Sequence, residues 1–148
     1  MRRSLLLLAL LTALGGGAAP ARAVDRPFLV VAHPAAPVTE LSRAQLSRLF
    51  LKKSTQWPDG SAVRPVEPLQ PGLRQAFARQ VHDRSLAELV GYWNALIFSG
   101  RELPPLEKAT DADVLSYVRA TPGAIGYVSA GVDTPGVKVV GVGKAPAP

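Results

Sequence analysis

The stretch Thr121-Pro-Gly-Ala-Ile-Gly-Tyr-Val128 decides the fold of this chain. Pro122 and Gly123 predict a turn, because proline presets one backbone dihedral and glycine takes conformations that other residues avoid. The residues Ala124 to Val128 then predict a short, buried strand. A second continuous apolar run, Phe28 to Ala32, predicts another such strand, as in a sheet that is covered on both faces.

Working outward from these runs, helices alternate with strands along the chain. Further strands are expected at Ala62 to Glu67 and at Val137 to Val142. Helices are expected from Ser42, with Gln45 at the capping-box position, to about Lys52, from Gly72 to Val81, from Ser85 to Gly100, and from Thr110 or Asp111 to Arg119. Valine-rich strands separated by helices predict an α/β fold with a mostly parallel mixed sheet and flanking helices.

The helix after Ser85 has the strongest sequence signals. Ser85 and Glu88 form a capping box, in which each side chain accepts a hydrogen bond from the other residue's backbone amide. Apolar residues follow at helical spacing, which predicts a face directed to the core. These residues are Leu86, Leu89, Val90, Trp93, Leu96 and Ile97. Tyr92 lies off this stripe, at an edge of the helix.

The first 23 residues have the three parts of a secretory signal peptide: Arg2 and Arg3, an apolar run from residue 5 to 14, and the end Ala21-Arg-Ala23. A membrane anchor is the alternative, but a helical span needs about 20 apolar residues. We therefore expect residues 24–142 to form one exported domain, periplasmic or secreted, without a membrane span. Residues 143–148 are expected to be a disordered tail.

Composition argues against several functions. Loss of residues 1–23 would lower the formal charge from +6 to +3, and the basic residues are scattered, which disfavours nucleic-acid binding. The chain has no cysteine, which excludes zinc fingers and cysteine nucleophiles. His33 and His82 lack acidic partners at ligand spacing, and no nucleophile-elbow motif occurs. We expect no enzyme, metal or cofactor.

Three segments together resemble the phosphate-binding proteins of ABC transporters, in the type 2 periplasmic binding protein superfamily. They are residues 41–53 with Trp57-Pro-Asp-Gly60, residues 91–100 (Gly-Tyr-Trp-Asn-Ala-Leu-Ile-Phe-Ser-Gly), and residues 121–128. The resemblance implies the lobe that begins at the hinge of a two-lobed receptor. A short, single-lobe member of this superfamily is therefore expected, with phosphate or another small oxyanion as ligand and an ABC transporter as partner.

The candidate site departs from the family pattern. Where such receptors have a Gly-Ser-Gly-Thr loop that opens a helix, this chain has Leu69-Gln-Pro-Gly-Leu-Arg74. Both hydroxyls are missing and proline removes one amide. The ligand-binding candidates that remain are the amides of Gly72 and Leu73 and the side chains of Gln70 and Arg74. The alternative is structural: Pro71 begins a helix well and Arg74 is a solvated side chain.

Two functions stay open from the sequence. The first is a solute-binding-like protein that holds an oxyanion weakly, since one lobe cannot enclose a ligand. The second is a non-catalytic interaction or sensor module that has lost the ligand cleft and docks on an envelope protein. Self-association, which could rebuild a cleft, is compatible with either function.

Overall fold

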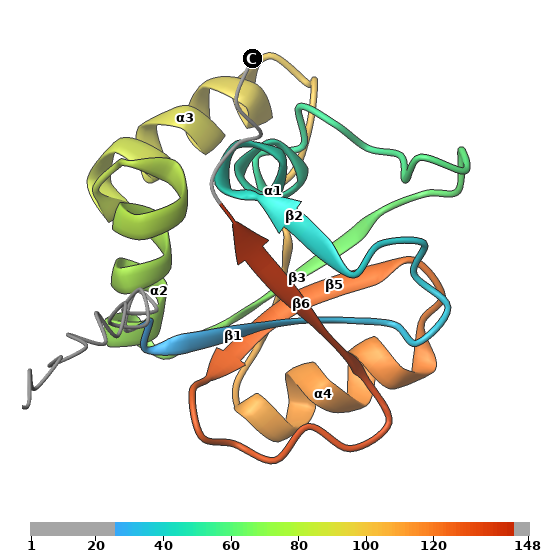
Figure 1. The fold of residues 1–148 in the computed structure, drawn as a ribbon. Helices are drawn as coiled ribbons and strands as arrows, with labels where there is room; N and C mark the ends of the chain where they lie inside the picture. Colours follow the sequence, from blue (N-terminus) through green and yellow to red (C-terminus); the bar gives the residue numbers. More distant parts are fainter. Residues whose placement is uncertain (1–25, 144–148) are drawn as a thin grey trace, which may run out of the picture.

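A computed structural model describes residues 26–143 of the chain, which form one six-stranded sheet with helices on both faces (Figure 1). The strand order across the sheet is β2-β6-β1-β5-β3-β4. The strands are β1 (Phe28–Ala32), β2 (Glu40–Ser42), β3 (Arg64–Pro68), β4 (Leu106–Lys108), β5 (Ala124–Ser129) and β6 (Lys138–Gly143). The helices are α1 (Arg43–Phe50), α2 (Pro71–Phe77), the π-helical turn η1 (Ala78–His82), α3 (Leu86–Phe98) and α4 (Asp111–Ala120).

The strand directions confirm a mostly parallel mixed sheet. β1 is antiparallel to both of its neighbours, β5 and β6, while the pairs β2–β6, β3–β5 and β3–β4 are parallel. The two outermost strands, β2 and β4, were not expected from the sequence. Each has three residues, which is too few to show a hydrophobic period.

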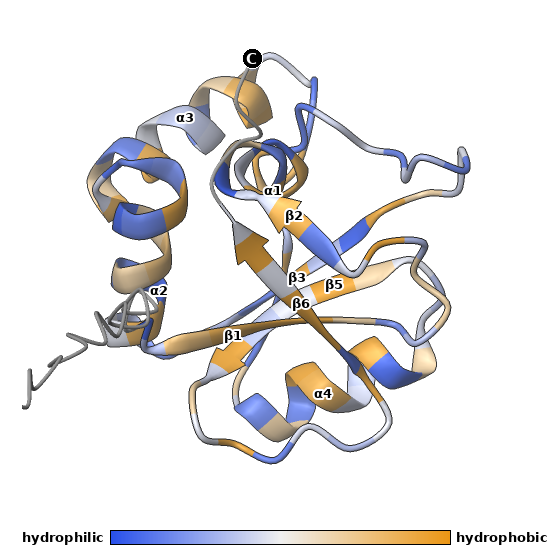
Figure 2. Ribbon diagram, viewed as in Figure 1, coloured by the Kyte–Doolittle hydropathy of each residue, from blue (hydrophilic) through white to orange (hydrophobic). Residues whose placement is uncertain are grey.

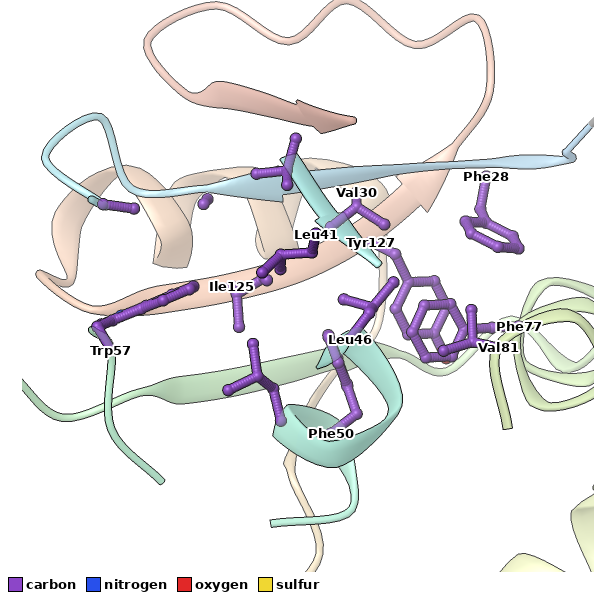
Figure 3. Packing of buried hydrophobic residues seen from close by; sticks show 14 of the residues in the cluster. Phe28, Val30, Leu41, Leu46, Phe50, Trp57, Phe77, Val81, Ile125 and Tyr127 are labelled. Carbon is purple, nitrogen blue, oxygen red and sulfur yellow. The ribbon is translucent and has the colours of Figure 1, made fainter. Parts of the chain in front are cut away.

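Alternate residues of the central strands face opposite layers of the core. In β1, Phe28 and Val30 point to the layer that α1, α2 and η1 cover, whereas Val31 points to α4. Figure 2 shows hydrophobic segments along α4, and Val114, Leu115 and Val118 of this helix are buried in that layer. On the other face, aromatic rings dominate: Phe77 and Tyr127 stack with centroids 3.8 Å apart and an interplanar angle of 2° (Figure 3).

The stretch 121–128 places the most buried strand of the sheet. Gly123 has φ +83°, and a Cβ atom there would collide with the carbonyl oxygen of Ala62. The carbonyl oxygen of Gly123 also accepts a hydrogen bond of 3.2 Å from Nε1 of the buried Trp57. The turn therefore requires glycine, and it delivers β5 into the centre of the sheet.

Local helix signals are confirmed by the structure. Ser42 with Gln45, and Ser85 with Glu88, form the two capping boxes at the starts of α1 and α3. Thr110, rather than Asp111, caps α4. The expected helix 72–81 begins one residue earlier, at Pro71, and its last turn is the π-helical η1.

The expectation that the apolar stripe of α3 faces the core was wrong. No residue of α3 is buried, and Val90 and Phe98 keep 58% and 88% of their surface exposed. In Figure 1, α3 lies beyond α1 and α2, on the side away from the sheet. Helical periodicity gives an apolar face but does not say whether another element covers it, and here the layer next to the sheet is already occupied by α1 and η1.

The domain extends slightly past the expected boundary. Gly143 pairs with Ser42 in the β2–β6 ladder, so the last strand ends one residue beyond 142. The expected signal peptide and residues 144–148 lie outside the described residues. Within residues 26–143, no helix has the length and apolar character needed to cross a membrane.

Candidate functional site

The candidate site at the start of α2 follows the end of strand β3. Gln70 is the N-cap residue with extended backbone, and Pro71 is the first helical residue. Gly72 is exposed, and a Cβ atom there would meet nothing within 4 Å. The side chain of Leu73 is buried in the core, so only its backbone amide is available to a ligand. The helix start is therefore open on its solvent side.

Arg74, the proposed counter-charge, already has two partners. Its Nη2 atom lies 3.4 Å from Oε2 of Glu67 and 3.1 Å from Oε1 of Glu107. One guanidinium is thus shared between two carboxylates. The Oε1 atom of Gln70 is buried without a hydrogen-bond partner in the part of the chain that the structure describes. The structure brings the four predicted site residues together, but the positive charge among them is largely neutralised.

Glu67 is the strongest electrostatic feature beside this site. It lies in β3 opposite Glu107 of β4, and its side chain retains only 13% of its surface. Burial raises the pKa of Glu67 to about 7; Arg74 opposes this rise and Glu107 adds to it. At neutral pH, the carboxyl group of Glu67 is therefore protonated in some molecules and ionised in others.

A pocket of about 150 Å³ opens behind this ion-pair cluster, between α3 and the layer of α1, α2 and η1. Polar groups of Glu67, Arg74, His82 and Tyr127 meet aromatic and aliphatic walls there. The apolar lining residues are Phe50, Leu51, Phe77, Ala78, Leu86, Leu89, Val90 and Trp93. The pocket exists because α3 stands away from the core instead of packing against it.

His82 lines the pocket as a neutral imidazole. Burial, together with the positive charges of Arg84 and Lys53, lowers its pKa to about 4. Its Nδ1 atom shares a hydrogen bond of 2.8 Å with Oγ of Ser47, and its ring packs against Phe77. His82 thus contributes a fixed polar edge and no charge.

Sequence reasoning did not find Glu67, Glu107, His82 or Tyr127 as members of one site. A signal existed for Glu67, since a carboxylate inside an otherwise buried strand needs a partner. The pairing of β3 with β4, which brings Glu107 to Glu67, could not be foreseen because β4 itself was not expected. Tyr127 was placed in a buried strand, but its neighbours across the sheet depend on the strand order.

Within residues 26–143, no three His, Asp or Glu side chains lie close enough together to hold a metal ion. The pocket carries hydrogen-bonding groups and apolar walls, and it holds neither a serine nor a threonine. Apolar walls with a few polar groups are typical of pockets that take small ligands.

The fold is a single α/β lobe with a pocket between α3 and the layer of α1, α2 and η1. The chain belongs to the PBP superfamily domain family, whose model matches residues 7–144. This confirms, at the level of the family, the resemblance that the three sequence motifs predicted.

Similar solved structures agree with this family. An ABC-type phosphate transport receptor from Vibrio cholerae is 21% identical, with a TM-score of 0.62, and the match covers 80% of this chain and 47% of that chain. PstS from Borrelia burgdorferi is 10% identical, with a TM-score of 0.60, and the match covers 82% and 49%. A phosphate-bound structure from Clostridium perfringens, described as a phosphate ABC transporter substrate-binding protein, is 23% identical, with a TM-score of 0.58 and coverage of 78% and 44%.

The matched region spans less than half the length of these solved structures. At such identities the likeness establishes the fold and not the ligand. No curated protein matches the chain.

Proposed function

We propose that this chain is a non-catalytic, solute-binding-like domain of the cell envelope, periplasmic or secreted after loss of residues 1–23. Its ligand in this proposal is phosphate or a related oxyanion, bound weakly at the start of α2. The amides of Gly72 and Leu73, the side chain of Gln70 and the guanidinium of Arg74 would make the contacts. An ABC transporter is the partner that the similar receptors suggest.

One observation carries this proposal: the helix start is open to solvent and lies next to a cation. Space around Gly72 is free, and the first amides of a helix have no intrahelical acceptor. The positive end of the helix dipole adds a favourable field for an anion. The phosphate held by the Clostridium perfringens structure supports the choice of ligand class.

The same geometry predicts weak binding. Arg74 would have to share its charge among the anion, Glu67 and Glu107. Like charges repel, so the two carboxylates oppose an incoming phosphate. A single lobe also leaves one side of the ligand in water, which lowers the strength of each electrostatic contact.

Thermal unfolding with phosphate, sulfate and chloride tests the proposal. A ligand at about 100 times its dissociation constant stabilises a protein by about 2.7 kcal/mol, which is a measurable rise in Tm. Arg74→Ala should abolish the phosphate response, whereas Arg79→Ala, an exposed control on η1, should keep it. Glu107→Gln should strengthen the response, because it frees Arg74. A phosphate response that survives in Arg74→Ala would rule out this site.

The second candidate is an interaction module that docks on an envelope protein. The uncovered face of α3 favours it, since Val90, Ile97 and Phe98 are all exposed. Apolar patches of this kind commonly mark protein contacts. This function becomes the better supported one if no anion shifts the Tm and crosslinking in the envelope captures one protein that a Phe98→Ser variant no longer reaches.

A further inference from the structure

The pocket between α3 and the layer of α1 and η1 is distinct from the solvent-facing start of α2. Its volume of about 150 Å³ is close to that of cavities that hold a benzene-sized molecule. What such a pocket binds depends on the charge at its polar end and on the character of its walls.

The ion-pair cluster at the polar end of the pocket has an excess of negative charge once Glu67 is ionised. Glu67 and Glu107 pair across β3 and β4, and Arg74 is the cation that reaches both of them. Glu67 and Arg74 line the pocket, and Glu107 pairs with Arg74 from outside it. Above the pKa of Glu67, about 7, two ionised carboxylates and one guanidinium leave one negative charge over. Glu67 holds this charge where water is largely excluded, so an added cation is favoured there more strongly than on the surface.

Positive charge lies near His82, another residue that lines the pocket. Arg84 and Lys53 lie over the ring of Tyr92, at 5.5 and 5.8 Å from its centroid, and neither lines the pocket. A cationic ligand would therefore place its charge at Glu67 and its apolar part toward His82. The field along the pocket orients the ligand as well as attracting it.

The walls suit an organic cation better than a bare ion. The aromatic side chains of Phe50, Phe77 and Trp93 line the pocket, and aromatic faces attract cations. Leu86 and Leu89 add aliphatic surface from α3. Binding of an apolar group is favoured at such walls, because it removes apolar surface from water.

Tyr127 supplies a further polar group. Tyr127 is 1% exposed and lines the pocket. Burial raises the pKa of Tyr127, so the hydroxyl stays protonated at any ordinary pH. The oxygen of this hydroxyl can accept a hydrogen bond from an ammonium group beside Glu67.

We propose that this pocket is a binding site for a small organic amine in its protonated form, with an apolar body of about the size of a benzene ring. Glu67 pairs with the ammonium group, Tyr127 accepts one of its hydrogens, and the walls from α3 and the core enclose the apolar body. This inference does not depend on the proposed oxyanion function, since it concerns a different ligand and a pocket that Gly72 and Leu73 do not line.

Calorimetric titration of the purified protein at pH 8, above the pKa of Glu67, with benzylamine, benzyl alcohol and benzoate tests this inference. These probes share one ring and differ in charge. We expect saturable binding of benzylamine that is at least about tenfold tighter than that of benzyl alcohol, and no binding of benzoate, since measured couplings of close charge pairs across an interface begin at about tenfold. Equal binding of the amine and the alcohol, tighter binding of benzoate, or no binding of the amine would overturn the proposal.

Two variants locate the site. Glu67→Gln should remove the preference for the amine over the alcohol, and Glu40→Gln, a glutamate on the edge strand β2, should keep it. Leu89→Trp should fill the pocket and block both ligands; Leu89 belongs to α3, which has no buried residue, so the core stays intact. Circular dichroism confirms folding of each variant. An amine preference that persists in Glu67→Gln contradicts the proposed role of this residue, and amine binding that persists in Leu89→Trp contradicts the pocket.

Discussion

Glu67 shows at the scale of one residue how the fold changes the chemistry of a side chain. The same carboxyl group has a pKa near 4.5 in an exposed chain and about 7 in the folded protein, chiefly because burial penalises its charge. This difference in pKa corresponds to a change in unfolding free energy of at most roughly 3 kcal/mol. Folding therefore favours the protonated form of Glu67, and this contribution to stability is lost as the pH rises.

We predict that Glu67→Gln changes the pH dependence of stability. Relative to this variant, the natural protein should lose up to about 3 kcal/mol of unfolding free energy as the pH rises from about 4.5 to above 7. His82, whose folded pKa is about 4, acts in the opposite direction, because its contribution is lost as the pH falls below 6.5. It is present in both proteins and cancels in the comparison.

Urea unfolding at pH 5 and pH 8 measures this difference. Glu40→Gln is the matched control, because this glutamate is exposed on the edge strand β2. Its stability should follow that of the natural protein at both pH values. Parallel profiles for Glu67→Gln and the natural protein would show that Glu67 is not buried as described.

Gly126 tests how tightly the sheet packs on α4. A Cβ atom there would lie 2.7 Å from Cγ1 of Val66 and 3.0 Å from Cγ1 of Val114, and both valines are fully buried. Gly126→Ala should therefore lower the unfolding free energy by about 1–3 kcal/mol, because overpacking forces neighbours to move. Gly91→Ala on α3, where nothing lies within 4 Å, should not lower it. Denaturant titration of both variants compares them directly.

At the scale of elements, α3 differs from the other helices. It begins with a complete capping box, yet none of its residues is buried. Its described attachments include a 2.7 Å hydrogen bond from the Tyr92 hydroxyl to the carbonyl oxygen of Leu51. A helix held in this way has little tertiary packing to protect it, and packing normally supplies most helical stability in proteins.

We therefore predict that the amides of α3 exchange with solvent much faster than those of α4, which buries Val114, Leu115 and Val118. Tyr92→Phe should accelerate exchange in α3 further and leave β1 and β5 unchanged. Hydrogen exchange followed by mass spectrometry measures both effects. Equal protection of α3 and α4 would mean that another surface covers α3 in solution.

The helices and strands also show which structural features can be predicted from local sequence patterns. Both capping boxes and the apolar runs of β1 and β5 were expected from the sequence, because caps and continuous apolar strands depend on neighbours along the chain. The short strands β2 and β4 were not expected, because each becomes a strand only by pairing with β6 or β3. The exposure of α3 was not predicted for a related reason: an apolar face is buried only if another helix or strand packs against it.

At the scale of the whole molecule, the two core layers share the central strands β1 and β5. A substitution that disrupts the packing of one layer therefore also destabilises the other layer through these strands. The domain should unfold in one cooperative step. α3 stands outside both layers, so its loss should not unfold the rest.

The two tryptophans can report separately on the unfolding of the core and on the unfolding of α3. Trp57 is buried in the core and Trp93 lies on α3. In Trp93→Phe, the remaining fluorescence should follow the same urea transition as circular dichroism of the whole domain. Trp57→Phe leaves Trp93 alone, and its fluorescence should begin to change at lower urea concentration. Coincident transitions in Trp57→Phe would show that α3 unfolds together with the core.

The sequence by itself determined the α/β class, the buried strands, the helix caps and the superfamily of this protein, because these depend on short-range patterns of residues. It also placed Gln70, Gly72, Leu73 and Arg74 at the start of a helix. The tertiary structure alone decided the strand order, and with it the meeting of Arg74 with Glu67 and Glu107. It also decided that α3 stands apart and leaves a pocket, since charge compensation and burial arise between segments distant in the chain.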